Sequence, residues 1–124
     1  MFVDFNTMPD NSRVWIYQAD REFTTNELDK ISDKLINFVS NWKRHGDDLK
    51  ASFKIAYDHF IILCVDENYN DVSGCSIDAS VHIIKEIQNE FNVDLLNKMN
   101  VSFKDGNNIN TVSLKDFKEF AKQN

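Results

Sequence analysis

Two short runs of the sequence are almost wholly apolar, Arg13 to Gln18 and Phe60 to Val65. Both are rich in β-branched and aromatic side chains, which favours a β-strand. A strand with one face in water alternates apolar and polar residues, and these two runs do not. We therefore expect both strands to lie in the middle of one sheet, buried on both faces.

A helix is predicted between these strands. Its start is marked by a capping box over Thr24–Glu27 and by an apolar staple between Phe23 and Leu28, because such a cap satisfies backbone N–H groups that a helix start leaves unpaired. Apolar residues then recur at helical spacing and define a buried face: Leu28, Ile31, Leu35, Phe38, Val39 and Trp42. We expect the helix to end at His45–Gly46, where histidine complements the helix dipole and glycine adopts a left-handed conformation.

The middle of the chain predicts a hairpin and a second helix. From Ala51 to Tyr57 apolar and polar residues alternate, as in a half-buried strand, and a tight turn at Asp58–His59 leads into the run Phe60 to Val65. The polar stretch from Asp66 to Gly74 is predicted as a loop. A second helix, ending at Asn92, is predicted from apolar residues at helical spacing: Ile77, Val81, Ile84, Ile87 and Phe91.

The pattern is weaker near the C-terminus. Val101 to Phe103 and Ile109 to Val112 are predicted as strands about a turn, and Ser113 with Asp116 caps a short helix. The order is then β-α-β-β-α-β followed by β-α, in one domain over residues 1–124. We expect an α+β fold of the ferredoxin-like βαββαβ type, an antiparallel sheet with both helices on one face and an added C-terminal β-hairpin strand and short helix.

Composition excludes several classes of protein. The charge is 14 Lys and Arg minus 20 Asp and Glu, or −6, without a basic stripe, so we expect no nucleic acid partner. The longest apolar run, Phe60 to Val65, is far shorter than the roughly 20 residues of a spanning helix, and Met1 does not open a signal sequence. We expect no membrane span and a cytoplasmic location. The two cysteines, Cys64 and Cys75, lack metal-binding or disulfide spacing and are expected to be free thiols, with no metal or cofactor.

A homodimer is predicted from the sheet. A face lined by Trp15, Tyr17 or Cys64 would be more apolar than a monomer normally exposes. The last helix or a second copy of the chain should therefore cover it.

The predicted topology also brings two loops together. The first helix and the third strand end at the same edge of the sheet, so the loop that contains His45 and Gly46 should meet the loop after Val65. The residues expected at this edge are Arg13, His45, Gly46, Asp66, Glu67, Ser73, Gly74, Cys75, Ser76 and Asp78. Cys75 and Ser76 begin the second helix, where free N–H groups and the helix dipole lower a thiol pKa or hold an anion.

Each candidate also has a structural interpretation. The segment Ser73–Asp78 is equally a turn with an N-cap, in which Ser76 caps or Asp78 complements the dipole. Cys75 is then a packed small side chain, and His45 only complements the dipole. Asp66 and Glu67 form an acid/base pair or are solvated turn acids. Three further residues are expected to be structural, namely Cys64 in the core and His59 and His82 on the surface.

Three segments carry a resemblance to known proteins: Ser12–Gln18, Trp42–Ala51 and the string Ser-Gly-Cys-Ser-Ile-Asp at Ser73–Asp78. Along most of its length the chain resembles a family of small bacterial proteins, common in the Bacteroidetes group, that often carry the label "ABC transporter ATPase". The resemblance implies a shared fold and a shared site at His45, Gly46, Asp66, Glu67 and Ser73–Asp78. It also implies that members usually continue beyond the point where this chain stops, at Asn124.

The chemistry of the chain argues against the ATPase label. A P-loop needs two glycines five positions apart, followed by Lys and then Ser or Thr. The three glycines are Gly46, Gly74 and Gly106, so no such loop can be drawn. We therefore expect no ATPase of this type.

Two functions remain open. The first is a non-catalytic domain that binds a small anionic ligand or a partner protein, at the apolar sheet face or at the helix start over residues 73–78. The second is a thiol-dependent enzyme or redox sensor in which Cys75 is an activated thiolate helped by His45. The second lacks a resolving cysteine if Cys64 is buried.

Overall fold

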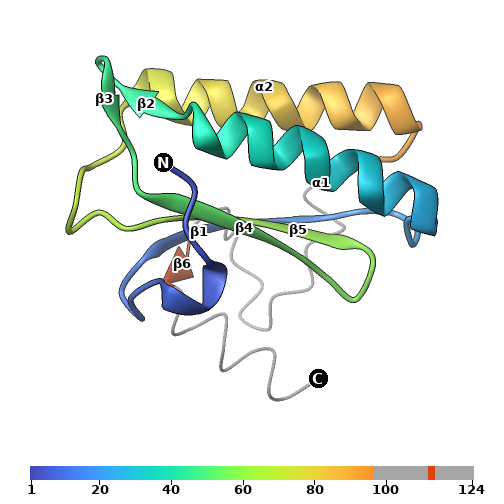
Figure 1. Ribbon diagram of the computed structural model, residues 1–124. Coiled ribbons are helices and arrows are strands. Elements are labelled where there is room, and N and C mark those ends of the chain that lie inside the picture. Colours follow the sequence, from blue (N-terminus) through green and yellow to red (C-terminus); the bar gives the residue numbers. More distant parts are fainter. Residues whose placement is uncertain (97–111, 114–124) are drawn as a thin grey trace.

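The computed structural model describes residues 1–96 and 112–113. The fold is α+β, with two long helices, a four-stranded antiparallel sheet and a separate two-stranded hairpin (Figure 1). The elements are η1 (Phe5–Thr7), β1 (Arg13–Gln18), α1 (Thr25–Ser40), β2 (Lys43–Arg44), β3 (Asp47–Asp48), β4 (Ala51–Ala56), β5 (Phe60–Val65), α2 (Gly74–Phe91) and β6 (Val112–Ser113).

The sheet places the two apolar runs in its interior. The strand order is β4-β5-β1-β6, and every neighbouring pair is antiparallel. β1 pairs with β5 from Arg13 opposite Val65 to Gln18 opposite Phe60. The interior position predicted for both runs is confirmed. The predicted strand at 101–103 and the short helix after Ser113 lie outside the described residues.

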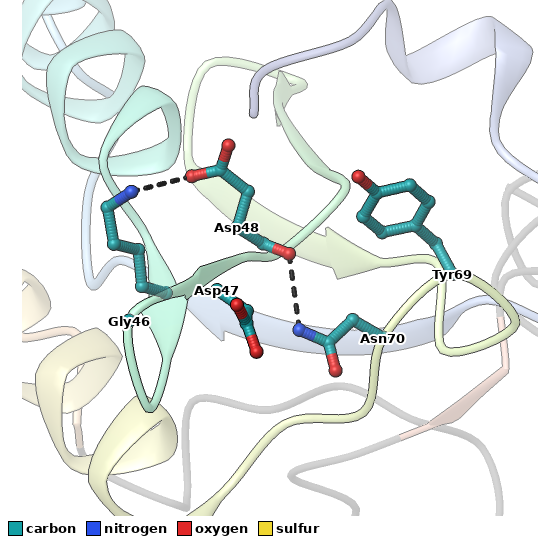
Figure 2. A pocket seen from close by; sticks show the side chains of 6 residues that line it. Gly46, Asp47, Asp48, Tyr69 and Asn70 are labelled. Atoms are coloured by element: carbon teal, nitrogen blue, oxygen red, sulfur yellow. Dashed lines mark hydrogen bonds and ion pairs between the residues drawn. The ribbon is translucent and has the colours of Figure 1, made fainter.

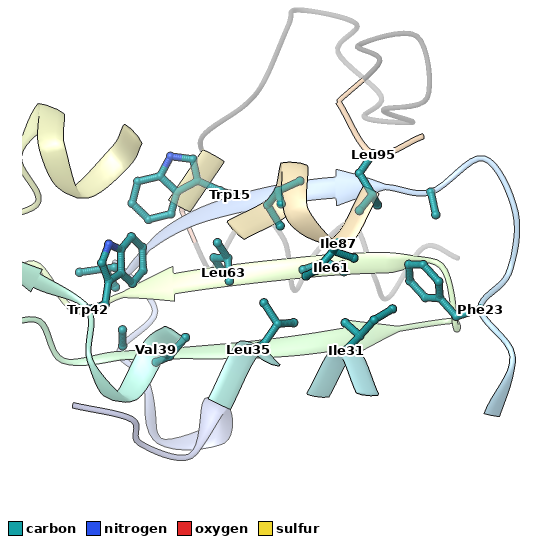
Figure 3. Packing of buried hydrophobic residues seen from close by; sticks show 14 of the residues in the cluster. Trp15, Phe23, Ile31, Leu35, Val39, Trp42, Ile61, Leu63, Ile87 and Leu95 are labelled. Carbon is teal, nitrogen blue, oxygen red and sulfur yellow. The ribbon is translucent and has the colours of Figure 1, made fainter. Parts of the chain in front are cut away.

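Both helices cover one face of the sheet (Figure 1). Their apolar stripes meet the odd-numbered residues of β1 and β5 in one buried cluster (Figure 3). This cluster includes Trp15, Ile31, Leu35, Val39, Ile61, Leu63, Ile84 and Ile87. Burying an aliphatic side chain of this size contributes about 1.5–3 kcal/mol relative to leaving it exposed, so the cluster is the main stabilising feature.

The opposite face of the sheet is also buried. Side chains alternate across a strand, so the even-numbered residues of the same strands point away from the helices. Together with Met8 and with Ala56 of β4 they form a second cluster, against which Val3 and Phe5 pack: Val14, Ile16, Phe60, Ile62 and Cys64 are its members from β1 and β5. Of the residues named for an apolar sheet face, Trp15 and Tyr17 pack on the helix side and Cys64 packs on the other.

Helix α1 begins as predicted but ends early. Thr24 and Glu27 form the complete capping box. The last helical residue is Ser40, and His45 and Gly46 instead form the turn between β2 and β3. Both turn residues have positive φ, 50° and 85°, as the two-residue turn of a tight hairpin requires. The predicted helix end and the role of His45 at it are wrong, since a pair of positive-φ residues also specifies a hairpin.

Helix α2 ends as predicted but has a different N-cap. Ser73 is the N-cap, and Asn92 ends the helix in the left-handed conformation. The predicted hairpin is also confirmed, with β4 and β5 joined through Tyr57, Asp58 and His59.

The start of α1 is tied to the end of α2 by an arginine. Arg21 donates through both terminal nitrogens to the two carboxylate oxygens of Glu27, at 2.8 and 2.9 Å. It also donates to the carbonyl oxygen of Phe91 at 2.7 Å. The Arg21 bond, helped by the backbone N–H of Thr24, lowers the pKa of Glu27 from 4.5 to about 2.

Candidate functional site

The β2–β3 hairpin lies against the loop after β5 and the first turn of α2. The Ser76 hydroxyl donates to the carbonyl oxygen of Lys43 at 2.8 Å, and the Trp42 indole N–H donates to the carbonyl oxygen of Ser76 at 2.9 Å. The Asn70 side chain donates to the carbonyl oxygen of Asp48 at 3.2 Å. The two loops therefore meet, as the topology predicted, and we call residues 43–48 and 66–78 together the rim.

The rim contains an open cleft with a volume of about 530 Å³. Its lining residues come from both sides of the rim: Lys43, Gly46, Asp47, Asp48, Tyr69 and Asn70. Figure 2 shows Tyr69 and Asn70 on the loop, opposite Asp48 on the hairpin. The Lys43 ammonium lies 2.8 Å from the Asp48 carboxylate and lowers the pKa of that carboxyl group. The cleft is thus polar, with an exposed aromatic ring at one wall.

Asp66 shapes the loop that forms this wall. The residue is only 6% exposed, and its carboxylate accepts the N–H of Asn68 at 3.0 Å. The carbonyl oxygen of Asp66 accepts the N–H of Tyr69 at 3.1 Å. Lys50 lies 3.9 Å from the carboxylate and balances its charge. The interpretation of Asp66 as a solvated turn acid is wrong, because these bonds hold it inside the fold.

The Glu67 side chain contacts different residues from those that Asp66 contacts. Its carboxylate lies 3.7 Å from Arg13 and accepts the N–H of Val72 at 3.4 Å. Arg13 is therefore at the rim, as expected, but as the partner of Glu67. Because Asp66 and Glu67 have separate partners, they do not form the predicted acid/base pair.

The first turn of α2 is capped by Ser73 rather than by Ser76. The Ser73 hydroxyl oxygen accepts the N–H of Ser76 at 3.2 Å. Ser76 is buried and serves instead as the link to the hairpin, while Asp78 is exposed and takes no part in the cap. Among the described hydrogen bonds, none uses the N–H groups of Gly74 or Cys75. A side chain at Gly74 would meet nothing within 4 Å, so the space outside this turn is open.

His45 and Cys75 are both exposed on the rim. No hydrogen bond joins them within the part of the chain that the structure describes. Cys75 is not a packed side chain, so that interpretation is wrong, whereas Cys64 is fully buried, as predicted. Both cysteines are free thiols.

The other histidines have structural partners. His59 Nδ1 lies 2.8 Å from the carbonyl oxygen of Tyr57, and His82 Nε2 lies 3.3 Å from Glu86 on the same helix. Within residues 1–96 and 112–113, no group of three His, Cys, Asp or Glu side chains is placed to hold a metal ion.

A second cleft, of about 380 Å³, lies at the far end of α2. Its polar atoms already serve the fold. The Asp20 carboxylate accepts the N–H of Asp94 at 3.0 Å, and the Gln88 amide oxygen accepts the N–H of Leu95 at 2.9 Å. The rim is therefore the better candidate for a ligand.

Sequence reasoning missed the residues that line the cleft from the loop side. The sequence patterns predict Tyr69 and Asn70 only as part of a polar loop. They also predict Lys43, which lines the cleft from the hairpin, only as part of a helix. Tyr69 is an aromatic residue within a polar loop, and this pattern is a sequence signal that could have identified it as a site residue. The buried link from Trp42 to Ser76 has no local signal, because it joins residues 34 positions apart.

Comparison of the chain with models of known protein families, with curated proteins and with solved structures gives no significant match. The resemblance to the family labelled "ABC transporter ATPase" therefore stays a prediction. Neither helix in the described part of the chain has the length and apolar character to cross a membrane.

Proposed function

We propose that this chain is a non-catalytic binding domain that holds an anionic group, of a small ligand or of a partner protein, at the rim. The observation that carries the proposal is the junction of the hairpin with α2. There, no described hydrogen bond uses the N–H groups of Gly74 and Cys75, and a side chain at Gly74 would meet nothing within 4 Å. The hairpin and the loop that meet at this junction also line a polar cleft. The positive end of the helix dipole favours an anion at these groups.

The rim is held in place before any ligand arrives. The bonds Ser76–Lys43 and Trp42–Ser76 fix the hairpin to α2, and the bond Asn70–Asp48 fixes the loop to the hairpin. A site that is already ordered loses little conformational entropy on binding. Binding therefore needs no rearrangement of the fold.

The test is a titration with inorganic phosphate, followed by the amide NMR signals of the protein. We expect saturable shifts at Gly74 and Cys75, and smaller ones at the cleft residues. Gly74→Asp should abolish the shifts, because it places a carboxylate beside the free N–H groups. Cys75→Ser should leave them unchanged. Asn89→Asp makes the same charge change on the exposed surface of α2, far from the rim, and is the control.

The proposal fails if phosphate shifts no signal at the rim, or if Gly74→Asp weakens binding no more than Asn89→Asp does. In that case residues 73–78 are only a turn and an N-cap. Binding that depends on the Cys75 thiol would instead favour the enzyme.

The alternative, a thiol-dependent enzyme or redox sensor, is supported only by the exposure of Cys75 at a helix start. It requires a thiolate that forms well below the ordinary thiol pKa. The measurement is the rate of alkylation of Cys75 against pH, with His45→Ala as the second variant. A low midpoint that rises in His45→Ala supports the enzyme, and a midpoint of about 8.5, the value for a free thiol, excludes it.

The finer features of the fold belong to the same proposal. The order β4-β5-β1-β6 with both helices on one face supports a ferredoxin-like topology, in which β6 is the last strand. A cytoplasmic location is supported by the two free thiols. The homodimer rests on the sequence prediction alone and is tested by the mass of the protein in solution.

A further inference from the structure

The outer edge of β4 carries backbone groups that point away from the sheet. The N–H of Asp66 donates to the carbonyl oxygen of Lys50, so even-numbered residues here face β5. The N–H of Ala51 donates to Met1, and the carbonyl oxygen of Ala51 accepts from Val3, so odd-numbered residues face outwards. The next two odd-numbered residues, Phe53 and Ile55, have no outward backbone partner among the described residues.

The N-terminal segment already uses the first position of this edge. Phe2 forms an isolated parallel bridge with Ala51. The chain then turns away at Asp4, whose side chain accepts the N–H of Asn6 and caps η1. The edge of β4 is thus paired with the N-terminal segment at Ala51. It is open at Phe53 and Ile55, beyond the point where that segment turns away.

Apolar side chains flank the open positions. Phe2 is 41% exposed, and its ring lies 5.6 Å from that of Phe53, which is half-buried. Ile36 of α1 is 42% exposed. Lys34 on the opposite flank of α1 pairs with Glu90 of α2 at 3.0 Å, so Ile36 projects on the side away from α2. An added strand would cover apolar surface as well as form backbone bonds.

Lys54 determines which strand fits. It is exposed between Phe53 and Ile55, its ammonium lies 5.6 Å from the Phe5 ring, and it has no ion pair within the described residues. A second copy of the chain paired through Phe53 and Ile55 would place the two Lys54 side chains opposite each other. Like charges opposite each other destabilise a strand pair, so Lys54 disfavours self-association.

We propose that the open edge of β4 binds an extended segment of a partner protein by strand addition, with an acidic residue of that segment opposite Lys54. The added strand would bond to the N–H and C=O groups of Phe53 and Ile55. Apolar residues on either side of the acidic one would extend the surface of Phe53, Ile55 and Ile36. This surface is separate from the rim, so a negative result for one proposal does not contradict the other.

The first test is amide hydrogen exchange in the free, dilute protein. An open edge requires fast exchange at Phe53 and Ile55 and slow exchange at Ser52 and Lys54, whose N–H groups face β5. This alternation is an internal control. Slow exchange at all four amides would overturn the proposal, because the edge would then be covered already. Protection at Phe53 and Ile55 that grows with protein concentration would also overturn it, in favour of a second copy.

The second test uses two blocked synthetic peptides, Ser-Thr-Val-Glu-Val-Thr-Ser and the same sequence with Lys in place of Glu. The Glu peptide should shift and protect the amides of Phe53 and Ile55, and should bind about two- to fivefold more tightly than the Lys peptide. Lys54→Glu should reverse this preference, whereas Lys85→Glu, the same charge change on α2, should not. Shifts elsewhere, or a preference that Lys54→Glu leaves unchanged, would refute the proposal.

Discussion

The two hairpins of this protein are built in opposite ways. In the β4–β5 hairpin, every residue of β5 is buried, and the strands pair over six residues each. In the β2–β3 hairpin, each strand has two residues, and none of these four residues is buried. Both hairpins turn through residues with positive φ. The first is therefore fixed by the core, and the second by hydrogen bonds to the rest of the rim.

The largest expected effect is on the buried hairpin. Leu63→Ala removes a fully buried side chain from β5 and should lower the free energy of unfolding by about 2–5 kcal/mol, because the core cannot close the cavity. Urea unfolding measures the change. Asp47→Ala in β3 is the matched variant for the exposed hairpin. It should change the free energy of unfolding by less than about 0.5 kcal/mol. Equal effects would contradict the contrast between the hairpins.

The next effect is on the anchor of the exposed hairpin. Trp42→Phe removes the indole N–H that bonds to Ser76 and should cost about 2 kcal/mol, from the lost bond and the lost ring volume. Amide exchange over residues 43–48 should also become faster. Trp15→Phe in the same cluster is the control, since no described hydrogen bond uses the Trp15 indole. If both variants leave exchange in the hairpin unchanged, Trp42 does not anchor it.

A smaller effect tests the turn. Gly46 has a φ of 85°, a conformation that an L side chain rarely adopts, although its Cβ would meet nothing within 4 Å. Gly46→Ala should therefore cost about 1 kcal/mol through backbone strain alone. Gly74→Ala, where the space is equally open and φ is not positive, is the control and should not destabilise the protein. Thermal unfolding compares the two variants.

The smallest effect is the response to acid. The folded pKa of Glu27 is about 2 against an ordinary 4.5, so its contribution is present above pH 4.5 and is lost as the pH falls towards 2. Because the Arg21 partner is partly exposed, we expect a loss of roughly half a kcal/mol. Unfolding of the wild type and of Glu27→Gln should differ at pH 6 and converge near pH 2. A constant difference across this range would contradict the assignment.

The Lys43–Asp48 pair responds in the same direction. Lys43 lowers the pKa of Asp48, so the pair holds at neutral pH and breaks only when the pH falls through that lowered value. NMR signals of the β2–β3 hairpin should then shift, while those of β5 should not.

The same contrast explains what the sequence could predict. β1, β5 and both helices follow from patterns of apolar residues, because burial imposes a period on the sequence. The sequence predicts a helix end at His45–Gly46, where the structure has a turn, because glycine after a polar residue is compatible with both structures. The meeting of the two loops followed from topology alone. The cleft could not be predicted in this way, because the positions of Tyr69, Asn70 and Lys43 in it depend on the folded backbone.

A central strand with no exposed side chain has a consequence for how such a protein diversifies. β5 is buried on both faces, so both proposed binding surfaces lie at the perimeter, at a loop junction and at a strand margin. Substitutions there leave the interior untouched. One scaffold can therefore acquire a new binding specificity by changing its border residues, without redesign of its centre.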